Sequence, residues 1–261
     1  MCLIAFAWKA HPDYSLIVGA NRDEWHDRPA APATWWGDHR QILAGRDLKA
    51  GGTWMGVTRS GRFAAVTNFR DPSDKRSMAR SRGELVMTFL LGAKSPGDFL
   101  SILRENAHEY NGFNLVAADS SSMAYFGSDA SEIKLLEPGV YALSNHTLNE
   151  PWPKVILAKS ALEAALRVKR SETARQMAIY AFLSNTSIAS DTALPDTGVG
   201  LARERALSSV LIVSPDYGTR ASTILSIAEN NRASFAEHTR ATNGVVSHVA
   251  KFSFDISDSR F

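Results

Sequence analysis

The sequence contains only one cysteine, Cys2, among its 261 residues. A single cysteine cannot form an internal disulfide, and this scarcity is typical of proteins from reducing compartments. One cysteine also cannot build a cysteine-rich zinc site, and the seven histidines include no pair at metal-ligand spacing. We therefore expect no disulfide and no resident metal, and no motif requires a cofactor.

Long hydrophobic runs and blocks of like charge are also missing. No segment approaches the ~18 apolar residues needed to cross a bilayer, and the apolar stretch 2–8 lacks the basic region of a signal peptide. The 29 basic and 27 acidic residues give a net charge of +2, too balanced for a nucleic-acid-binding protein. These absences predict a cytoplasmic protein without a transmembrane segment or a nucleic acid partner, and they leave the oligomeric state open.

What remains is an ordinary globular composition, with 44% hydrophobic and 21% charged residues. A chain of this length hides roughly 70–75% of its unfolded surface on folding, so one large core is feasible. The only stretch that resembles a linker, 184–205, is too short to mark a domain boundary. We predict one domain over residues 1–261.

Apolar patterns occur in groups of strands separated by pairs of helices. The expected strands are 2–8, 14–20, 53–58, 62–68, four segments within 112–144, and 209–213, 220–228, 233–239 and 245–252. The expected helices lie near 81–92, 96–109, 153–168 and 171–184. Residues 21–50 follow neither period and are predicted to form a long ordered loop. Because helices do not alternate singly with strands, the order favours an α+β sandwich over a Rossmann or TIM fold.

The position of Cys2 gives it a possible chemical role. Removal of Met1 would leave a residue that carries both a thiol and an α-amine, and that amine has a reference pKa near ~7.7–8.0. It can therefore act as the base for its own nucleophile. The alternative is that Cys2 is a small buried hydrophobic residue, which is the common fate of a lone cysteine.

Polar residues follow several of the expected apolar strands. Asn21, Arg22 and Asp23 follow directly on the second strand, where a carboxylate could hold an amine and a guanidinium could lower the pKa of a thiol or bind an anion. Asn68 and Asn145 also end strands, and their amides could stabilise an oxyanion. The alternatives are a solvated charged loop and turn-forming asparagines.

Two further features concern ligand binding. Arg220 opens the strand 220–228, where it could clamp an anion or form a salt bridge at the sheet edge. Trp35 and Trp36 could line an apolar pocket, although core packing is their usual fate.

Several segments resemble the NRDE protein family, which is the family of the transport-and-Golgi-organisation protein two. The resemblance rests on MCLI at the start, GANRDE at 19–24, GGTWMGVTRSGRFAAVTNFRD at 51–71, ALSN at 142–145, LPDTG at 194–198 and YGTRASTIL at 217–225. Their order is kept along the whole chain. The family is similar in turn to N-terminal-nucleophile hydrolases of the choloylglycine hydrolase and penicillin V acylase kind.

That resemblance implies a four-layer αββα sandwich with the nucleophile on the first strand. It implies that Cys2 is the nucleophile and that Asp23 holds its amine. Asn68 and Asn145 would match oxyanion positions, and Arg220 a late active-site arginine. The acylases have the sequence Gly-Arg-Asn-x-Asp at this point, and this chain has Ala20 in place of the arginine. Arg22 lies two residues further on, so on a strand its side chain would be on the same face as that of Ala20 and could replace the missing arginine.

Two functions are compatible with these residues. The first is a hydrolase that uses Cys2 to cleave an amide or thioester bond of a small amphipathic substrate. The second is a non-catalytic carrier for haem or for acyl-CoA and related lipids, in which Arg22 and Arg220 pair with propionates or phosphates and Asn21, Trp35 and Trp36 help to form the pocket. The resemblance associates the family with both lipid handling and haem trafficking.

Overall fold

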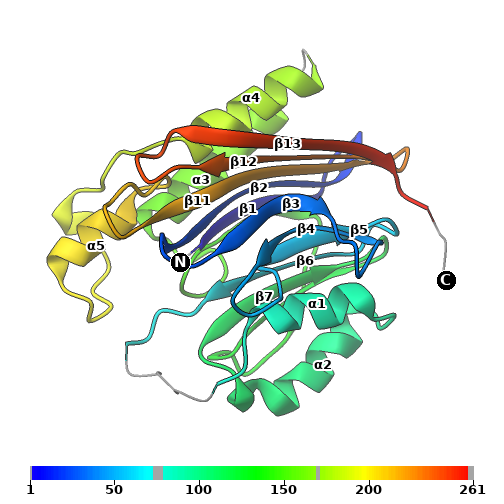
Figure 1. Ribbon diagram of the computed structural model, residues 1–261, viewed down its shortest axis with the longest axis horizontal. Coiled ribbons are helices and arrows are strands. Elements are labelled where there is room, and N and C mark those ends of the chain that lie inside the picture. The colour runs from blue at the N-terminus through cyan, green and yellow to red at the C-terminus, as the bar shows by residue number, and fades with distance from the viewer. Residues whose placement is uncertain (1, 73–78, 169–170, 258–261) are drawn as a thin grey trace.

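Two antiparallel sheets lie face to face between two helical layers in the computed structural model, which describes residues 2–72, 79–168 and 171–257 (Figure 1). The strands are β1 (Cys2–His11), β2 (Tyr14–Trp25), β3 (Ala30–Trp35), β4 (Ile42–Asp47), β5 (Met55–Thr58), β6 (Phe63–Asn68), β7 (Phe113–Ala118), β8 (Met123–Gly127), β9 (Lys134–Leu135), β10 (Gly139–Leu143), β11 (Tyr217–Ala228), β12 (Arg232–Arg240) and β13 (Val246–Asp255). The helices are α1 (Gly83–Leu91), α2 (Pro96–Asn106), α3 (Pro153–Leu166), α4 (Glu172–Leu183) and α5 (Leu201–Ser208), with short 3-10 turns at Ala107–Glu109 and Asp191–Ala193.

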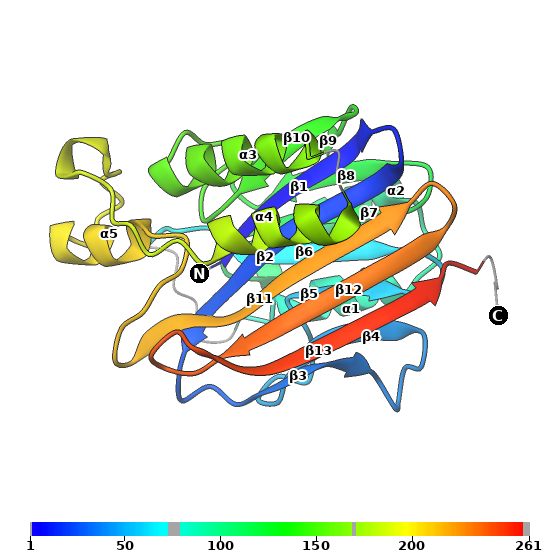
Figure 2. The same ribbon diagram turned by 90° about the horizontal axis from the view of Figure 1, so that it is seen from above.

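The six-stranded sheet has the order β10-β1-β2-β11-β12-β13, and the seven-stranded sheet runs from β3 to β9 in sequence order. Helices α3 and α4 cover the outer face of the first sheet, and α1 and α2 cover the second (Figures 1 and 2). The expected four-layer αββα arrangement is therefore confirmed. Among the described residues, no helix is both long and apolar enough to cross a membrane.

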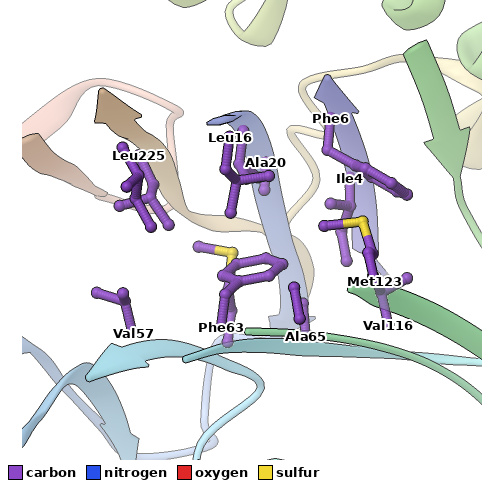
Figure 3. Close-up of a cluster of buried hydrophobic side chains, with 14 of the residues drawn as sticks. Ile4, Phe6, Leu16, Ala20, Val57, Phe63, Ala65, Val116, Met123 and Leu225 are labelled. Carbon is purple, nitrogen blue, oxygen red and sulfur yellow. The ribbon is translucent and has the colours of Figure 1, made fainter. Parts of the chain in front are cut away.

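Successive side chains of the central strands point to opposite faces of the sheet, and this produces two hydrophobic cores. Ile4 and Phe6 face the opposite sheet, where they pack near Phe63 in the inter-sheet core (Figure 3). Leu3 and Ala5 point the other way and pack against α3 and α4. Strands that are covered on both faces read as continuous apolar runs, which explains the pattern at the start of the sequence.

The prediction of one long loop over residues 21–50 is wrong. Strand β2 continues to Trp25, and the segment then forms β3 and β4. Pro32 obscured this because proline disfavours strands, but β3 lies at a sheet edge, with a register irregularity between Ala31 and Thr34. Residues 21–50 therefore contain two strands that the spacing of apolar residues in the sequence did not indicate.

The predicted strand 209–213 is also wrong. Val210, Leu211 and Ile212 are buried but Val213 is exposed, and the segment meets β11 through an isolated bridge between Val213 and Gly218 instead of forming a strand of the sheet. Leu211 N–H donates to the Asn185 carbonyl at 2.8 Å, and Ile212 N–H donates to Thr219 Oγ1 at 2.9 Å. Hydrophobicity predicted the burial of residues 210–212 correctly but not the conformation of the segment.

Other predicted features are confirmed. The four expected helices are present, and the Ser95 hydroxyl caps α2 by accepting the Asp98 N–H at 3.2 Å. Gly61 turns the β5–β6 hairpin with a positive φ of 78°. The stretch 184–205, treated in the sequence as a possible linker, includes the start of α5.

Phe63 provides a test of the inter-sheet core. It is fully buried at the centre of that core (Figure 3). We predict that Phe63→Ala lowers the free energy of unfolding by about 3–5 kcal/mol, because the deletion leaves a cavity between two sheets. Met177→Ala, on the exposed face of α4, should stay within about 0.5 kcal/mol of the parent. Urea unfolding followed by fluorescence measures both, and equal effects would contradict the assignment of the core.

Candidate active site

Cys2 occupies the first position of β1, at the end of the central strands. It pairs directly with Arg22 on β2. Its side chain is only 7% exposed, yet it forms part of the wall of a cavity of about 500 Å³. Cavities of this size accommodate small organic ligands. The side chain of Cys2 is therefore shielded from bulk solvent, yet a ligand bound in this cavity could contact it.

The surroundings of Cys2 do not favour its thiolate form. Burial raises the pKa of the Cys2 thiol, and the charge of Asp23 raises it further. A hydrogen bond from the Asp23 backbone and the charge of Arg22 act in the opposite direction. Because the net effect is upward, a reaction through this sulfur needs a base to remove its proton.

Asp23 lies at the same end of the sheet, on the strand next to Cys2. The Thr219 hydroxyl donates to its Oδ1 at 2.7 Å, across the β2–β11 pair. Burial raises the pKa of the Asp23 carboxyl, and the largest effect that lowers it is the charge of Lys154. The sequence prediction placed Asp23 near Cys2, and the pairing of β1 with β2 brings them together.

Lys154 is a member of this group that sequence reasoning missed. It lies in the first turn of α3, directly after Pro153, and is only 3% exposed. Its Nζ has no hydrogen-bond partner among the described residues. Burial lowers its pKa to about 8, against the charges of Asp23 and Cys2. One sequence signal was available: a lysine in the first turn of a helix opposes the helix dipole.

A buried ion pair extends the same group of charges. Arg70 Nη1 lies 2.7 Å from Glu204 Oε2, and both side chains are almost fully buried. Glu204 also accepts hydrogen bonds from the Thr197 backbone at 3.0 Å and from its hydroxyl at 2.5 Å. The segment 194–198 is thus tied through α5 to the strand ends near Cys2, a role its sequence did not reveal.

The two asparagines of the sequence prediction contact each other. Asn145 Nδ2 donates to the Asn68 carbonyl at 3.1 Å, and Ser144 Oγ donates to the Cys2 carbonyl at 3.1 Å. Asn68 lines the cavity that contains Cys2, while Asn145 is completely buried behind it. Asn68 is therefore the better placed of the two to reach a ligand.

The two predicted arginines both line the cavity, with different partners. Arg22 lies on the same face of β2 as Ala20, the face that is turned toward the opposite sheet. Its buried Nη1 has no hydrogen-bond partner among the described residues. Arg220 Nη1 donates to the carbonyls of Trp25, His26 and Arg28. Arg220 therefore holds the turn after β2, while Arg22 lies 3.7 Å from Glu24 through its Nη2 and keeps Nη1 without a hydrogen-bond partner among the described residues.

Asn21, Trp35 and Trp36 lie elsewhere. Asn21 Nδ2 donates to the carbonyls of Leu183 and Val210 at 2.9 and 2.8 Å. Trp36 is in the core beneath α1 and α2, with its indole donating to the Ala44 carbonyl, and Trp35 packs against Phe254. The structure does not bring these side chains to Cys2, because each is satisfied by packing or by backbone groups.

Basic groups outnumber acidic ones around the cavity. The basic residues of its lining are Arg22, Arg28, Arg46, Lys49, Arg80, Arg82 and Arg220, and the acidic ones are Asp23, Glu24, Asp47 and Glu237. Several of these form ion pairs, including Arg28 with Asp47 at 2.6 Å. Arg46 is also paired with Asp38, and Arg80 with Glu84 and Glu109, so carboxylates outside the lining neutralise most of this surplus, and the space favours a strongly polar group.

A second cavity of about 370 Å³ adjoins the first. It shares Glu24, Asn68, Arg82 and Asn111 with the first cavity. Its other lining is more apolar and comes from Trp25, Phe69, Pro72, Val199, Ala206, Leu207, Ile212 and Tyr217, with Arg70, Asp71, Arg203 and Ser214. Together the two spaces could receive a molecule with one polar and one apolar part. Among the described residues, no group of three or more His, Cys, Asp or Glu side chains could hold a metal ion.

The fold and the site define a class of protein: a four-layer αββα sandwich with a cysteine as the first residue of its first strand, in the wall of a ligand-sized cavity. Comparison with known proteins identifies the family. The chain belongs to the Transport and Golgi organisation 2 family, whose sequence profile matches residues 1–242.

Similar proteins occur in several animals. The bovine and human Transport and Golgi organization protein 2 homologs are 37% and 35% identical to this chain, and each match covers 91% of this chain and 92% of the relative. The Drosophila melanogaster Transport and Golgi organization protein 2 is 26% identical, covering 92% of both chains. The resemblance to this family is therefore confirmed over almost the whole sequence.

Two solved structures also align with the chain. One is a Caenorhabditis elegans ortholog of N-acylethanolamine-hydrolyzing acid amidase, with 12% identity, a TM-score of 0.41, and coverage of 86% of this chain and 92% of that one. The other is the C2A mutant of the conjugated bile acid hydrolase from Clostridium perfringens, with 9% identity, a TM-score of 0.42, and coverage of 97% and 92%.

The pKa of Lys154 leads to a test of this buried charge. With a pKa of about 8 in the folded protein and about 10.4 when unfolded, the unfolded chain binds more protons between these values. Stability must therefore rise with pH in this window, and below pH 8 the penalty of burying the charge is fully present. We predict that the stability of the parent relative to Lys154→Met increases by roughly 3 kcal/mol from pH 8 to pH 10.5. Urea unfolding at several pH values measures it, and a constant difference would contradict the assignment.

Proposed function

We propose that the chain is a cysteine hydrolase of the N-terminal-nucleophile type, acting on an amide or thioester bond of a small amphipathic substrate. The observation that supports this most strongly is the placement of Cys2, buried at the head of β1 yet lining the cavity beside Asp23 and Asn68. A structural cysteine has no need of a ligand-sized space, whereas a nucleophile does.

In the proposed reaction, removal of Met1 frees the α-amine of Cys2. That amine takes the thiol proton while the sulfur forms a bond to the substrate carbonyl carbon. Asp23 orients the resulting ammonium, and the side-chain amide of Asn68, whose backbone carbonyl accepts a hydrogen bond from Asn145, donates to the oxyanion. The carbon–nitrogen or carbon–sulfur bond then breaks, and the leaving group takes the proton from the ammonium.

The second half of the reaction releases the acyl group. Water attacks the acyl-enzyme carbonyl and gives its proton to the same amine. The bond to the Cys2 sulfur breaks, the proton returns to the thiolate, and the carboxylic acid product leaves. The charged cavity suits a polar or anionic part of the substrate, and the apolar cavity suits its hydrophobic part.

Variants of Cys2 test this proposal. We expect Cys2→Ala to abolish turnover of any N-acyl amide or acyl thioester that the parent cleaves. Cys2→Ser should weaken turnover strongly, because a hydroxyl is harder to deprotonate than a thiol. Product formation by mass spectrometry over a panel of such substrates gives the readout, and unchanged turnover in Cys2→Ala would contradict the proposal.

One observation favours a second function, that of a carrier. The buried Nη1 of Arg22 has no hydrogen-bond partner among the described residues, in a cavity whose lining is rich in arginine. A propionate of haem or a phosphate of acyl-CoA would supply an acceptor for it. Such a carrier would need no nucleophile, so its binding would not depend on Cys2.

Titration distinguishes the two functions. For a carrier, haem or a long-chain acyl-CoA should bind Cys2→Ala as tightly as the parent, while Arg22→Ala should weaken binding by about tenfold or more, since a charge-assisted hydrogen bond is lost. Arg40→Ala, which changes an exposed arginine outside the cavity lining, is the matched control. Equal binding by Arg22→Ala and Arg40→Ala would remove the basis of the carrier hypothesis.

A further inference from the structure

We propose that the part of the cavity over β11 and β12 is a subsite for an uncharged, polyhydroxylated part of the substrate, bound between Arg22 and Glu237. The inference rests on the proposed function and deepens it, because it names the chemistry of the polar part of the substrate. Glu237 is then a specificity-determining residue, at a position on β12 that no sequence motif singled out.

A row of residues across four neighbouring strands forms the floor of this subsite. Cys2 on β1 is paired with Arg22 on β2, and Arg22 is paired with Ala221 on β11. Thr239 on β12 is opposite Ala221 and completes the row (Figure 2). All four line the cavity, on the face of the sheet that is turned toward the opposite sheet. Because neighbouring strands lie about 4.8 Å apart, Ala221 is roughly 10 Å from Cys2.

Two polar atoms without partners lie on either side of Ala221. They are the buried Nη1 of Arg22 and the buried Oγ1 of Thr239, and neither has a hydrogen-bond partner among the described residues. Arg22 as a whole is only 9% exposed. Buried polar atoms that lack partners are costly. A ligand group lying over the small side chain of Ala221 would be within reach of both atoms and would offset this cost.

Glu237 forms a third side of the subsite, two residues before Thr239 and on the same face of β12. It is only 4% exposed, yet it lines the cavity. Its Oε1 accepts the Ala33 N–H at 2.7 Å. Its Oε2 would lie 3.4 Å from a Cβ at position 45, so Gly45, which also lines the cavity, leaves space beside this oxygen. A carboxylate can accept about four hydrogen bonds, so a ligand donor can be added to the Ala33 N–H and the nearby Thr223 hydroxyl.

The mixture of charges around this space selects the ligand. Arg22 and Glu237 face the same cavity, but the ion-pair partner of the guanidinium is Glu24, 3.7 Å from its Nη2. Glu237 would repel a carboxylate or a phosphate bound here, and Arg22 would repel an ammonium group. Adjacent hydroxyl groups carry no charge, and each can both accept a hydrogen bond from Arg22 and donate one to Glu237. A polyol therefore has the chemistry that this subsite fits.

The rate at which paired iodoacetamides alkylate Cys2 tests the proposal without a known substrate. Because the chain has one cysteine, the added mass reports on this sulfur alone. Each probe carries a linear spacer on its amide nitrogen, and the spacer ends in a 1,2-diol, a hydrocarbon of equal length, a carboxylate or an ammonium group. Spacers about 5, 10 and 15 Å long bracket the distance from Cys2 to Ala221. Only preparations with the same first residue, established by intact mass, are compared.

We expect the diol probe to react about tenfold faster than the hydrocarbon probe at the spacer length of about 10 Å, because hydrogen bonds to charged side chains add affinity. Glu237→Gln keeps an oxygen for the Ala33 N–H but presents an amide NH2 to the ligand, so the preference should fall to about twofold or less. Ala221→Leu, which fills the floor, should have the same effect. Glu229→Gln, on the exposed turn between β11 and β12 and outside the cavity lining, is the matched control and should keep the preference of the parent.

Folding of the variants is checked by circular dichroism. If Glu237→Gln and Ala221→Leu do not fold, Thr239→Val decides the question, because it replaces only the hydroxyl and should also reduce the preference. No diol preference in the parent, or an undiminished one in the folded variants, would overturn the proposal, as would faster reaction of the carboxylate or ammonium probe. The outcome is separable from that of the proposed function, which fails through unchanged turnover in Cys2→Ala, whereas the alkylation ratios require no turnover.

Discussion

The pairing of β2 with β1 on one side and β11 on the other is the constraint on which the site depends. It places Arg22 opposite Cys2 and Thr219 opposite Asp23 at one end of the six-stranded sheet. The apolar part of these strands is buried on both faces of the sheet. A shift of the strand pairing by one residue would move every side chain to the opposite face, so burial fixes the register. The same hydrophobic pattern that stabilises the sandwich therefore positions the polar group at its end.

The strand ends carry a dense set of buried ionisable groups, which is unusual in a protein interior unless they are paired or functional. Lys154 enters from α3, and the Arg70–Glu204 pair connects the group to α5. Such networks are costly to bury, and removal of one partner leaves an uncompensated buried charge. The helices do more than cover the sheet, because α3 brings the Lys154 ammonium and α5 the Glu204 carboxylate into this group.

Sequence reasoning predicted the layers and part of the site. Continuous apolar runs and grouped helices indicated the sandwich. The position of the single cysteine after Met1 indicated Cys2, and polar residues after apolar strands indicated Asp23 and Asn68. It missed Lys154: a lysine in the first turn of a helix was a weak signal, and the burial of its side chain depends on packing against other elements. It also misjudged Trp35 and residues 21–50, because edge strands with proline have no clear period and tryptophan does not reveal in sequence whether it lines a pocket or fills a core.

The most direct test of the central claim is the intact mass of the protein expressed in cells from its own Met1-Cys2 start. The account predicts a mass lower by one methionine, which leaves Cys2 as the first residue with a free α-amine. Incubation with a cleavable thioester should then add one acyl group to this residue. A chain that retains Met1 and acquires no acyl group would contradict an N-terminal nucleophile and would favour the carrier function.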